Sequence, residues 1–224
     1  PVSFLPSRRA GALPPVGRGT RLLLAQPFVN NTARALMARG ATPLTAPMPL
    51  GVEGTLAWLG AAAAAWGVSP ARVEAVAAAH ARRARQALTP LREALSGKRI
   101  SFLPDSQLEI PLARFLASEC GMEVVEVAVP HLDRQFMAAE LERLPATVPV
   151  IEGQHVELQL ERVRAARPDL TVCGLGLANP LEADGLRTKW SIELVFSPVQ
   201  GFEQAADLAE LFARPLLRAA RLEV

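Results

Sequence analysis

The chain has 224 residues, of which 50% are apolar, and its mean hydropathy is +0.20. This length and apolar content can form one large buried core or two smaller ones. The formal net charge is only +2, and the basic residues, nearly all arginines, are spread among 22 acidic residues. This distribution excludes the clustered basic surface of a nucleic-acid-binding protein, so we expect no nucleic-acid partner.

Cys120 and Cys173 are the only cysteines and form neither a C-x-x-C pair nor a disulfide framework. This usage favours a reducing compartment, so we expect a cytoplasmic protein. The N-terminal residues lack the apolar core of a signal peptide. The longest uncharged stretch, 54–71, is rich in alanine and contains glycine and proline, so we expect no transmembrane helix. Because the sequence starts at Pro1 without a methionine, we also expect a fragment of a longer protein.

The N-terminal part of the chain predicts an arm followed by a small strand–helix–strand unit. Residues 1–20 are rich in Pro, Gly and Arg and are expected to form a linker or an exposed arm. The apolar run 21–28 predicts a buried strand. Residues 30–40 have the apolar spacing of a helix that ends at Gly40, and residues 42–49 return to extended structure.

Residues 69–95 form the longest predicted helix. Ser69 is a favoured N-cap residue, and Pro70 suits the first helical position. Pro90 lacks the backbone N–H that a helix interior requires, so we expect the helix to break or kink there.

Beyond Gly97 the chain alternates between short apolar runs and segments of helical periodicity. The predicted strands are 99–104, 122–130, 147–153, 169–174 and 191–196. The predicted helices are 105–121, 154–168 and a terminal helix over 202–222 that Pro215 interrupts. Within the second of these helices, Val156, Leu160 and Val163 fall on one face and are expected to face the core.

This strand–helix alternation predicts an α/β protein with parallel sheets. The order Arg, apolar run, Pro, polar helix start and Gly occurs twice, from Arg21 and from Arg99, which indicates an internal repeat. We therefore predict two Rossmann-like parallel-sheet domains, over residues 21–97 and over residues 98–224 with a C-terminal helix. The boundary between them is expected near Gly97.

The segment G-L-G-L-A-N-P, from Gly174 to Pro180, follows a predicted strand where nucleotide-binding folds place their phosphate loop. A dinucleotide fingerprint has a third glycine and leads directly into a helix, whereas Asn179 and Pro180 stand at those positions here. We therefore interpret Gly174 and Gly176 as turn residues at the carboxyl edge of a parallel sheet. That edge is nevertheless where open α/β sheets bind ligands.

The residues indicate no metal site and no hydrolytic mechanism. Neither cysteine has another cysteine or a histidine at ligand spacing, so we expect both to be buried and inert. The three histidines form no H-x-x-x-H pair, and no G-x-S-x-G elbow occurs. Trp190, with Phe196 six residues later, follows a loop; it either packs in the core or offers a platform to a flat apolar ligand.

A long signature, G-L-G-L-A-N-P-L-E-A-x-G-x-x-T-K-W-S-I-E-L-V-F, runs from Gly174 to Phe196. It resembles the C-terminal region of the N subunits of light-independent protochlorophyllide reductase, a nitrogenase-like family. Residues 21–41 and 99–127 fit the same subunits, so the resemblance covers almost the whole chain. Small departures from the family pattern occur at Asp184, Arg187, Phe202 and Ala206.

The resemblance implies the fold of the nitrogenase molybdenum–iron protein, with this chain as the second and third domains of the N subunit. It implies a B subunit in an α2β2 heterotetramer and a separate L protein that hydrolyses ATP and delivers electrons. It implies a [4Fe-4S] cluster whose ligands come from an absent N-terminal region and from the B subunit, so we expect no ligand here. The implied reaction is the ferredoxin-dependent reduction of the ring D double bond of protochlorophyllide to chlorophyllide, in (bacterio)chlorophyll biosynthesis.

The resemblance also implies an apolar substrate cavity, and the segment that lines it in the family matches Trp190 and Phe196. We expect both side chains to pack against the tetrapyrrole, with Leu175, Leu177 and Leu186 as further wall residues. The family implies that the proton donor comes from the partner subunit or from the substrate. Two alternatives remain open: another nitrogenase-like reductase, such as chlorophyllide reductase, and a two-lobed Rossmann-like binding module without redox activity.

Overall fold

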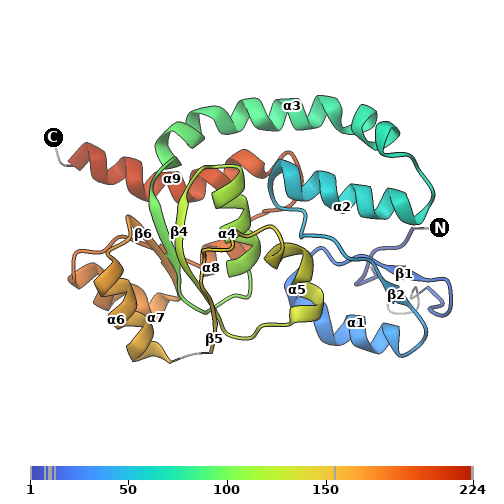
Figure 1. Cartoon of the computed structure of the whole chain (residues 1–224), viewed down its shortest axis with the longest axis horizontal. Coiled ribbons are helices and arrows are strands. Elements are labelled where there is room, and N and C mark those ends of the chain that lie inside the picture. Colours follow the sequence, from blue (N-terminus) through green and yellow to red (C-terminus); the bar gives the residue numbers. More distant parts are fainter. Residues whose placement is uncertain (1, 8, 10–11, 13, 154, 223–224) are drawn as a thin grey trace.

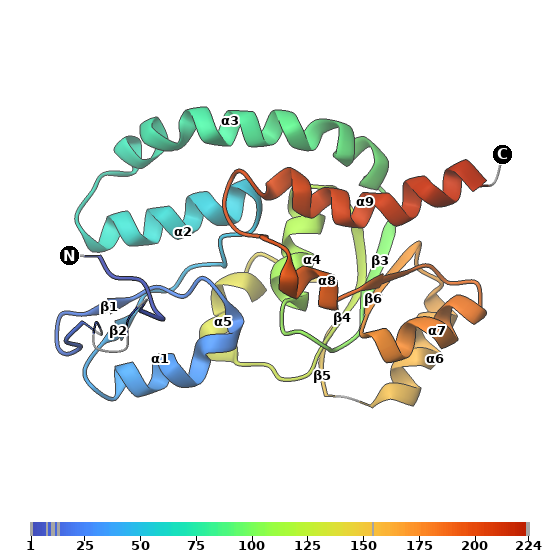
Figure 2. The ribbon, with the colours of Figure 1, turned by 180° about the vertical axis from the view of Figure 1, so that it is seen from behind.

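The computed structural model of the chain describes residues 2–7, 9, 12, 14–153 and 155–222. It contains a two-stranded and a five-stranded β-sheet, both parallel. Figure 1 shows the two sheets toward opposite ends of the molecule, with three helices along one side: α2 (Gly51–Ala65), α3 (Pro70–Leu95) and α9 (Ala205–Leu222). Figure 2 shows the same arrangement from behind. The predicted α/β class with parallel sheets is confirmed.

The five-stranded sheet has the strand order β5-β4-β3-β6-β7. Its strands are β3 (Arg99–Phe102), β4 (Glu123–Val129), β5 (Val150–Glu152), β6 (Leu170–Cys173) and β7 (Thr188–Trp190). The helices between them are α4 (Glu109–Ser118), α5 (Arg134–Leu141), α6 (Val156–Ala166) and α7 (Leu175–Ala183). The chain starts at central β3, moves outward to β5, and then returns to place β6 on the other side of β3. The direction of winding therefore reverses between β3 and β6.

The N-terminal unit consists of β1 (Arg21–Leu22), α1 (Asn30–Met37) and β2 (Thr42–Pro43). The predicted strand 21–28 is shorter than expected, because β1 ends at Leu22 and the 3-10 helix η1 (Pro27–Val29) takes the last two residues of the predicted range. In the middle of this run, the backbone carbonyl groups of Leu24 and Ala25 accept hydrogen bonds from side chains and not from a neighbouring strand. Trp58 Nε1 and Gln200 Nε2 donate to them at 2.7 and 2.6 Å.

Both long helices continue through prolines. Pro90 lies within α3 and Pro215 lies within α9, so the predicted interruption at Pro215 and a break at Pro90 are wrong. A proline removes one helical hydrogen bond, but α3 and α9 pack against each other, and this packing stabilises both helices across the missing bond. Figures 1 and 2 show α3 bending toward the sheet in its last turns. None of the helices in the described residues is long and apolar enough to cross a membrane.

The predicted strand 191–196 is wrong, because these residues form the short helix α8 (Ile192–Phe196) and the preceding strand β7 ends at Trp190. The alternation in S-I-E-L-V-F fits a strand, but helical spacing is what buries Leu194 and leaves its apolar neighbours exposed. Lys189 Nζ donates to Glu193 Oε2, and this ion pair links β7 to the first turn of the helix.

Helix α6 differs from its prediction at the N-terminal end. The predicted helix starts at Gln154, which lies outside the described residues, and α6 begins at Val156. Val163 is buried and Leu160 packs beside it, as predicted, but Val156 is 40% exposed because it occupies the first helical turn.

Two hydrophobic clusters form the core. The larger one extends from Met48 to Leu216 and joins side chains of α2 and α3 to the five-stranded sheet and to α9. The smaller one packs between α6, α7 and the sheet and consists of Leu103, Val163, Cys173, Ala178, Leu181 and Leu186. The larger cluster contains residues from both sides of Gly97, and the domain division at Gly97 stays a prediction.

A buried polar network holds the start of α2 on the five-stranded sheet unit. Arg114, which is 1% exposed, donates from Nε to Glu140 Oε2 at 2.6 Å and from Nη2 to the Met48 carbonyl at 3.1 Å. Glu119 Oε2 accepts a hydrogen bond from the Val52 N–H at 2.6 Å. Burial raises the pKa of Glu119 to about 7, although Arg114 opposes the shift.

Candidate functional site

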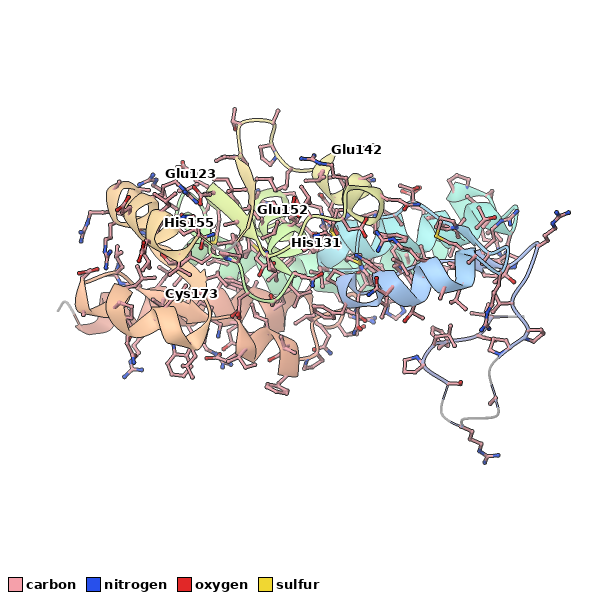
Figure 3. All side chains as sticks on the ribbon, turned by 90° about the horizontal axis from the view of Figure 1, so that it is seen from below. Glu123, His131, Glu142, Glu152, His155 and Cys173 are labelled. Carbon is pink, nitrogen blue, oxygen red and sulfur yellow. The ribbon has the colours of Figure 1, made fainter. Side chains whose placement is uncertain are left out.

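The strand order of the five-stranded sheet reverses between the carboxyl ends of β3 and β6. In open α/β sheets, ligands bind in the crevice beyond the carboxyl ends of the strands at this reversal. Residues 103–108 leave β3 at this point, and Gly174 leaves β6. Figure 3 looks toward this edge of the sheet from below Figure 1. The side chains at this edge of the sheet therefore form the candidate site.

Glu109, the first residue of α4, shapes the loop that leaves β3. Its Oε1 accepts hydrogen bonds from the backbone N–H groups of Asp105 and Ser106 at 2.9 and 2.6 Å. Gln107 in the same loop has a φ of 66°. Burial raises the pKa of the Glu109 carboxyl group, and its Oε2 has no hydrogen-bond partner among the described residues. This loop also explains why the predicted helix 105–121 begins only at Glu109.

Asp105 reaches across the end of β6 to the end of β7. Ser191, directly after β7, donates from Oγ to Asp105 Oδ2. The same Oγ lies 3.1 Å from the Cys173 carbonyl oxygen, which also accepts a hydrogen bond from the Ser191 N–H at 3.0 Å. Because β6 lies between β3 and β7, this side chain links two strands that are not neighbours in the sheet.

Gly174 leaves the space that this link needs. A Cβ at this position would lie 2.9 Å from Asp105 Oδ1, whereas the φ of Gly174, −66°, suits any residue. Gly176 lies in the first turn of α7, so its interpretation as a turn residue is wrong, whereas Gly174 is the N-cap of α7 and the single residue at the exit of β6. The strand leads directly into a helix, as in a phosphate site. The carboxyl group of Asp105 beside Gly174 nevertheless opposes the binding of an anion there.

Five large apolar side chains are exposed beyond the carboxyl ends of β6 and β7. We call them the exposed apolar patch: Leu175, Trp190, Ile192, Val195 and Phe196. Trp190 is 38% exposed and Phe196 is 82% exposed. Cys173 lies opposite Trp190 in the β6–β7 register, so Leu175 and Trp190 emerge from neighbouring strands at the same edge. Clustered exposed apolar side chains mark interaction sites on soluble proteins.

The two remaining predicted wall residues lie in the interior. Leu186 is 5% exposed and belongs to the smaller hydrophobic cluster. Leu177 is partly buried and packs against the same cluster. The structure thus brings Leu175, Trp190 and Phe196 to the surface and places Leu177 and Leu186 in the packing between α7 and the sheet.

Both cysteines are buried free thiols, as predicted, and burial raises the pKa of Cys120 and of Cys173 to about 12. Cys120 lies in the larger hydrophobic cluster and Cys173 in the smaller one, so the two thiols are not grouped to bind an iron–sulfur cluster. His131 Nδ1 lies 3.1 Å from Glu152 Oε1, and Figure 3 shows Cys173 apart from this pair. Across residues 14–153 and 155–222, no three His, Cys, Asp or Glu side chains are grouped to hold a metal ion.

Comparison with known proteins gives the family of the chain. Residues 3–217 match the family described as nitrogenase component 1 type oxidoreductase. The chain belongs to this family. Oxidoreductases of the nitrogenase component 1 type have an iron–sulfur cluster in their complexes, and no residue described above fits it.

Two curated relatives of this chain share one name with each other. Light-independent protochlorophyllide reductase subunit N of Halorhodospira halophila is 64% identical over 224 residues, which are 100% of this chain and 53% of the relative. The subunit of that name from Acidiphilium rubrum is 63% identical over 223 residues, which are 100% of this chain and 53% of the relative. The chain thus spans about half the length of the curated relatives it matches.

Solved structures support the same fold. The structure named Nitrogenase Cp1 at pH 5 matches with a TM-score of 0.65 at 16% identity, over 85% of this chain and 45% of that one. The structure at pH 6.5 matches with a TM-score of 0.66 at 13% identity, over 85% of this chain and 47% of that one. These identities show the fold alone, and they confirm the predicted nitrogenase-like architecture.

Sequence patterns did not single out Asp105, Ser191 or Glu109 as site residues. Asp105 directly follows the predicted strand 99–104. Polar residues at the carboxyl end of a strand, next to the point where the winding reverses, often belong to a binding site, and this pattern points to Asp105. Ser191 stood inside a predicted strand, where its side chain had no expected partner. The strand order brings Asp105 and Ser191 together, whereas Glu109 contacts Asp105 within the loop after β3.

Proposed function

We propose that this chain is part of the N subunit of a light-independent protochlorophyllide reductase, which reduces the ring D double bond of protochlorophyllide. The observation that carries this proposal is the name shared by curated relatives that are 61% to 64% identical over 99% to 100% of the chain. Membership of the nitrogenase component 1 type oxidoreductases supports the redox class. The chain forms the second and third domains of the subunit in this proposal.

In the proposed assembly the N subunit pairs with a B subunit in an α2β2 heterotetramer in the cytoplasm. A separate L protein, similar to the nitrogenase iron protein, hydrolyses ATP and supplies the electrons. The supporting observation is that this chain spans about half of its relatives and has an exposed apolar patch beyond the carboxyl ends of β6 and β7. Such a patch is suited to burial in a larger complex.

The ligands of the [4Fe-4S] cluster lie outside this chain in the proposal. The two buried thiols, Cys120 and Cys173, do not fit the cluster, because they lie in separate hydrophobic clusters of the core. We therefore assign to this chain only the binding and orientation of the substrate, and no residue of it transfers an electron or a proton.

The proposed substrate contact is the exposed apolar patch. Trp190 and Phe196 offer aromatic faces to a flat tetrapyrrole, and Leu175 adds an aliphatic contact. Rigid aromatic side chains supply a large apolar area with only two rotatable bonds each, so little entropy is lost on binding. Leu177 and Leu186 belong to the same wall in the proposal and support it from the interior of the fold.

The function is tested with the full-length N subunit, co-expressed with the B subunit and supplied with the L protein, ATP and a reductant. We expect conversion of protochlorophyllide to chlorophyllide, which is monitored by the shift of the pigment absorbance. Chlorophyllide is offered separately as a substrate to separate this reaction from that of a chlorophyllide reductase. Consumption of chlorophyllide but not of protochlorophyllide would contradict the proposal.

The substrate contact is tested by Trp190→Ala in the same full complex. Loss of the aromatic face is expected to raise the KM for protochlorophyllide by about tenfold, equivalent to about 1.4 kcal/mol of binding free energy. Trp66→Ala is the matched control, because Trp66 is 57% exposed at the end of α2 and belongs to no proposed contact. An unchanged KM and turnover in Trp190→Ala would remove this residue from the site.

A further inference from the structure

The position of Trp190 depends on a strand that is weakly held by its own ladder. The strand β7 has three residues, lies at the edge of the sheet, and pairs only with β6. Trp190 is its last residue, so the backbone that carries the indole lies where a short edge strand frays most readily. Something beyond the ladder has to fix the carboxyl end of β7 if Trp190 is to keep one orientation.

Ser191 supplies this fixation from the neighbouring position. It is 1% exposed, and its N–H extends the ladder by one hydrogen bond, 3.0 Å long, to the Cys173 carbonyl. Its hydroxyl has a single proton, which it donates to Asp105 Oδ2. The residue that follows the indole is thus held by both β6 and the loop after β3.

Gly174, which has no side chain, leaves room for Asp105 beside the path to Ser191. The carboxyl group crosses the end of β6, and its Oδ1 lies 2.9 Å from the point where a Cβ of residue 174 would stand. Asp105 is itself held by the loop, because its backbone N–H donates to Glu109 Oε1 at 2.9 Å. The link therefore runs from the buried Glu109, through Asp105, to the end of β7.

We propose that Asp105 and Ser191 are positioning residues that hold Trp190 in the orientation in which it contacts the flat ring of the substrate. This inference rests on the proposed function and adds two polar residues that do not themselves touch the substrate. An aromatic side chain that is fixed before binding loses less entropy on binding than a mobile one, so the link increases the affinity for the substrate.

The first test is Asp105→Ala in the full complex, with the KM and kcat for protochlorophyllide and the equilibrium affinity measured by pigment titration. Asp105 is exposed, so its replacement is tolerated by the core. We expect the KM and Kd to rise about three- to tenfold, while kcat changes less. Asp105→Asn keeps an oxygen that accepts the Ser191 hydroxyl proton and is expected to restore the affinity. Ser191→Ala is expected to match Asp105→Ala, and the double variant is expected to be no worse than either single one.

A second test uses the space at Gly174. Gly174→Ala is expected to displace the Asp105 carboxyl group and to raise the KM as Asp105→Ala does. In the Asp105→Ala background the added methyl group meets no carboxyl group, so Gly174→Ala is expected to have no further effect. Ser118→Ala is the control, because Ser118 Oγ donates to a backbone carbonyl at 2.8 Å on α4, away from the site.

The outcomes separate the inference from the function on which it rests. If Trp190→Ala raises the KM but Asp105→Ala and Ser191→Ala do not, the positioning role is refuted and the substrate contact stands. If these two variants lower the thermal midpoint without changing the Kd, the link is only structural and the inference is again refuted. If Trp190→Ala has no effect, the proposed substrate contact itself is refuted.

Discussion

Gly51 shows at the scale of one residue how closely α2 is fitted against α4. Gly51 begins α2 with a φ of 71°, which L-residues with a side chain rarely adopt. A Cβ there would lie 2.3 Å from Glu119 Oε1 and 2.4 Å from Phe115 Cδ2. Both the backbone conformation and the available space therefore require glycine.

We expect Gly51→Ala to lower the free energy of unfolding by about 2–4 kcal/mol, from strain at positive φ and from overpacking. Gly60→Ala is the matched control in the same helix, because a Cβ at Gly60 meets no atom within 4 Å. That change is expected to raise the free energy of unfolding by about 0.5–1 kcal/mol through helix propensity. Urea unfolding of both variants checks the opposite signs, and equal effects would show that the close contact is relieved by small shifts.

At the scale of a single element, α3 contains a proline in its interior. Pro90 is exposed and interrupts the hydrogen bonds of a 26-residue helix that nevertheless remains one element. The intrinsic penalty of a proline in a helix interior is about 3 kcal/mol relative to alanine. The packing of α3 against α2 and α9 outweighs this penalty.

We therefore expect Pro90→Ala to raise the free energy of unfolding by about 1–3 kcal/mol, because it restores a hydrogen bond and removes a clash. The thermal midpoint is the measurement. Gln86→Ala, one turn earlier on the same helix, is the control and is expected to change stability by less than about 0.5 kcal/mol. A destabilised Pro90→Ala would show that the bend at the end of α3 is needed for its packing.

The apolar pattern of each element also explains which elements can be predicted from the sequence. The buried strands β3, β4 and β6 were predicted within a few residues, because an apolar run between polar segments has few alternatives inside an α/β fold. The segment 191–196 is predicted wrongly, because its six residues fit either period. Only the packing of the folded chain buries Leu194 and leaves Ile192, Val195 and Phe196 exposed. The exposed aromatic residues were found from a resemblance, whereas Asp105 and Ser191 depend on strand order, which a local pattern does not contain.

At the scale of the whole molecule, the polar network around Arg114 joins the segment before α2 to the five-stranded sheet unit. Arg114 contacts Glu140, and a side-chain carboxyl oxygen of Glu140 accepts the Met48 N–H at 2.6 Å. Glu119 holds the first turn of α2 through the N–H groups of Val52 and Glu53. Because these contacts are buried, we expect the segment before α2 to separate from the five-stranded sheet unit only when the hydrogen bonds of this network break.

Glu119 makes this junction dependent on pH. Burial raises its folded-state pKa from the ordinary 4.5 to about 7, so between these values the folded chain binds more protons than the unfolded chain. The contribution of Glu119 to stability is therefore full below about pH 4.5 and is lost as the pH rises through 7, a loss on the order of 3 kcal/mol. We expect Glu119→Gln to reduce the slope of urea-unfolding free energies measured between pH 5 and pH 8, even if it lowers the stability at every pH. Part of the slope is expected to remain, because burial also raises the pKa of Glu109. Glu157→Gln, at an exposed position on α6, should keep the slope. An identical pH dependence in the wild type and in Glu119→Gln would mean that the carboxyl group of Glu119 is already ionised below pH 5 and is held by Arg114.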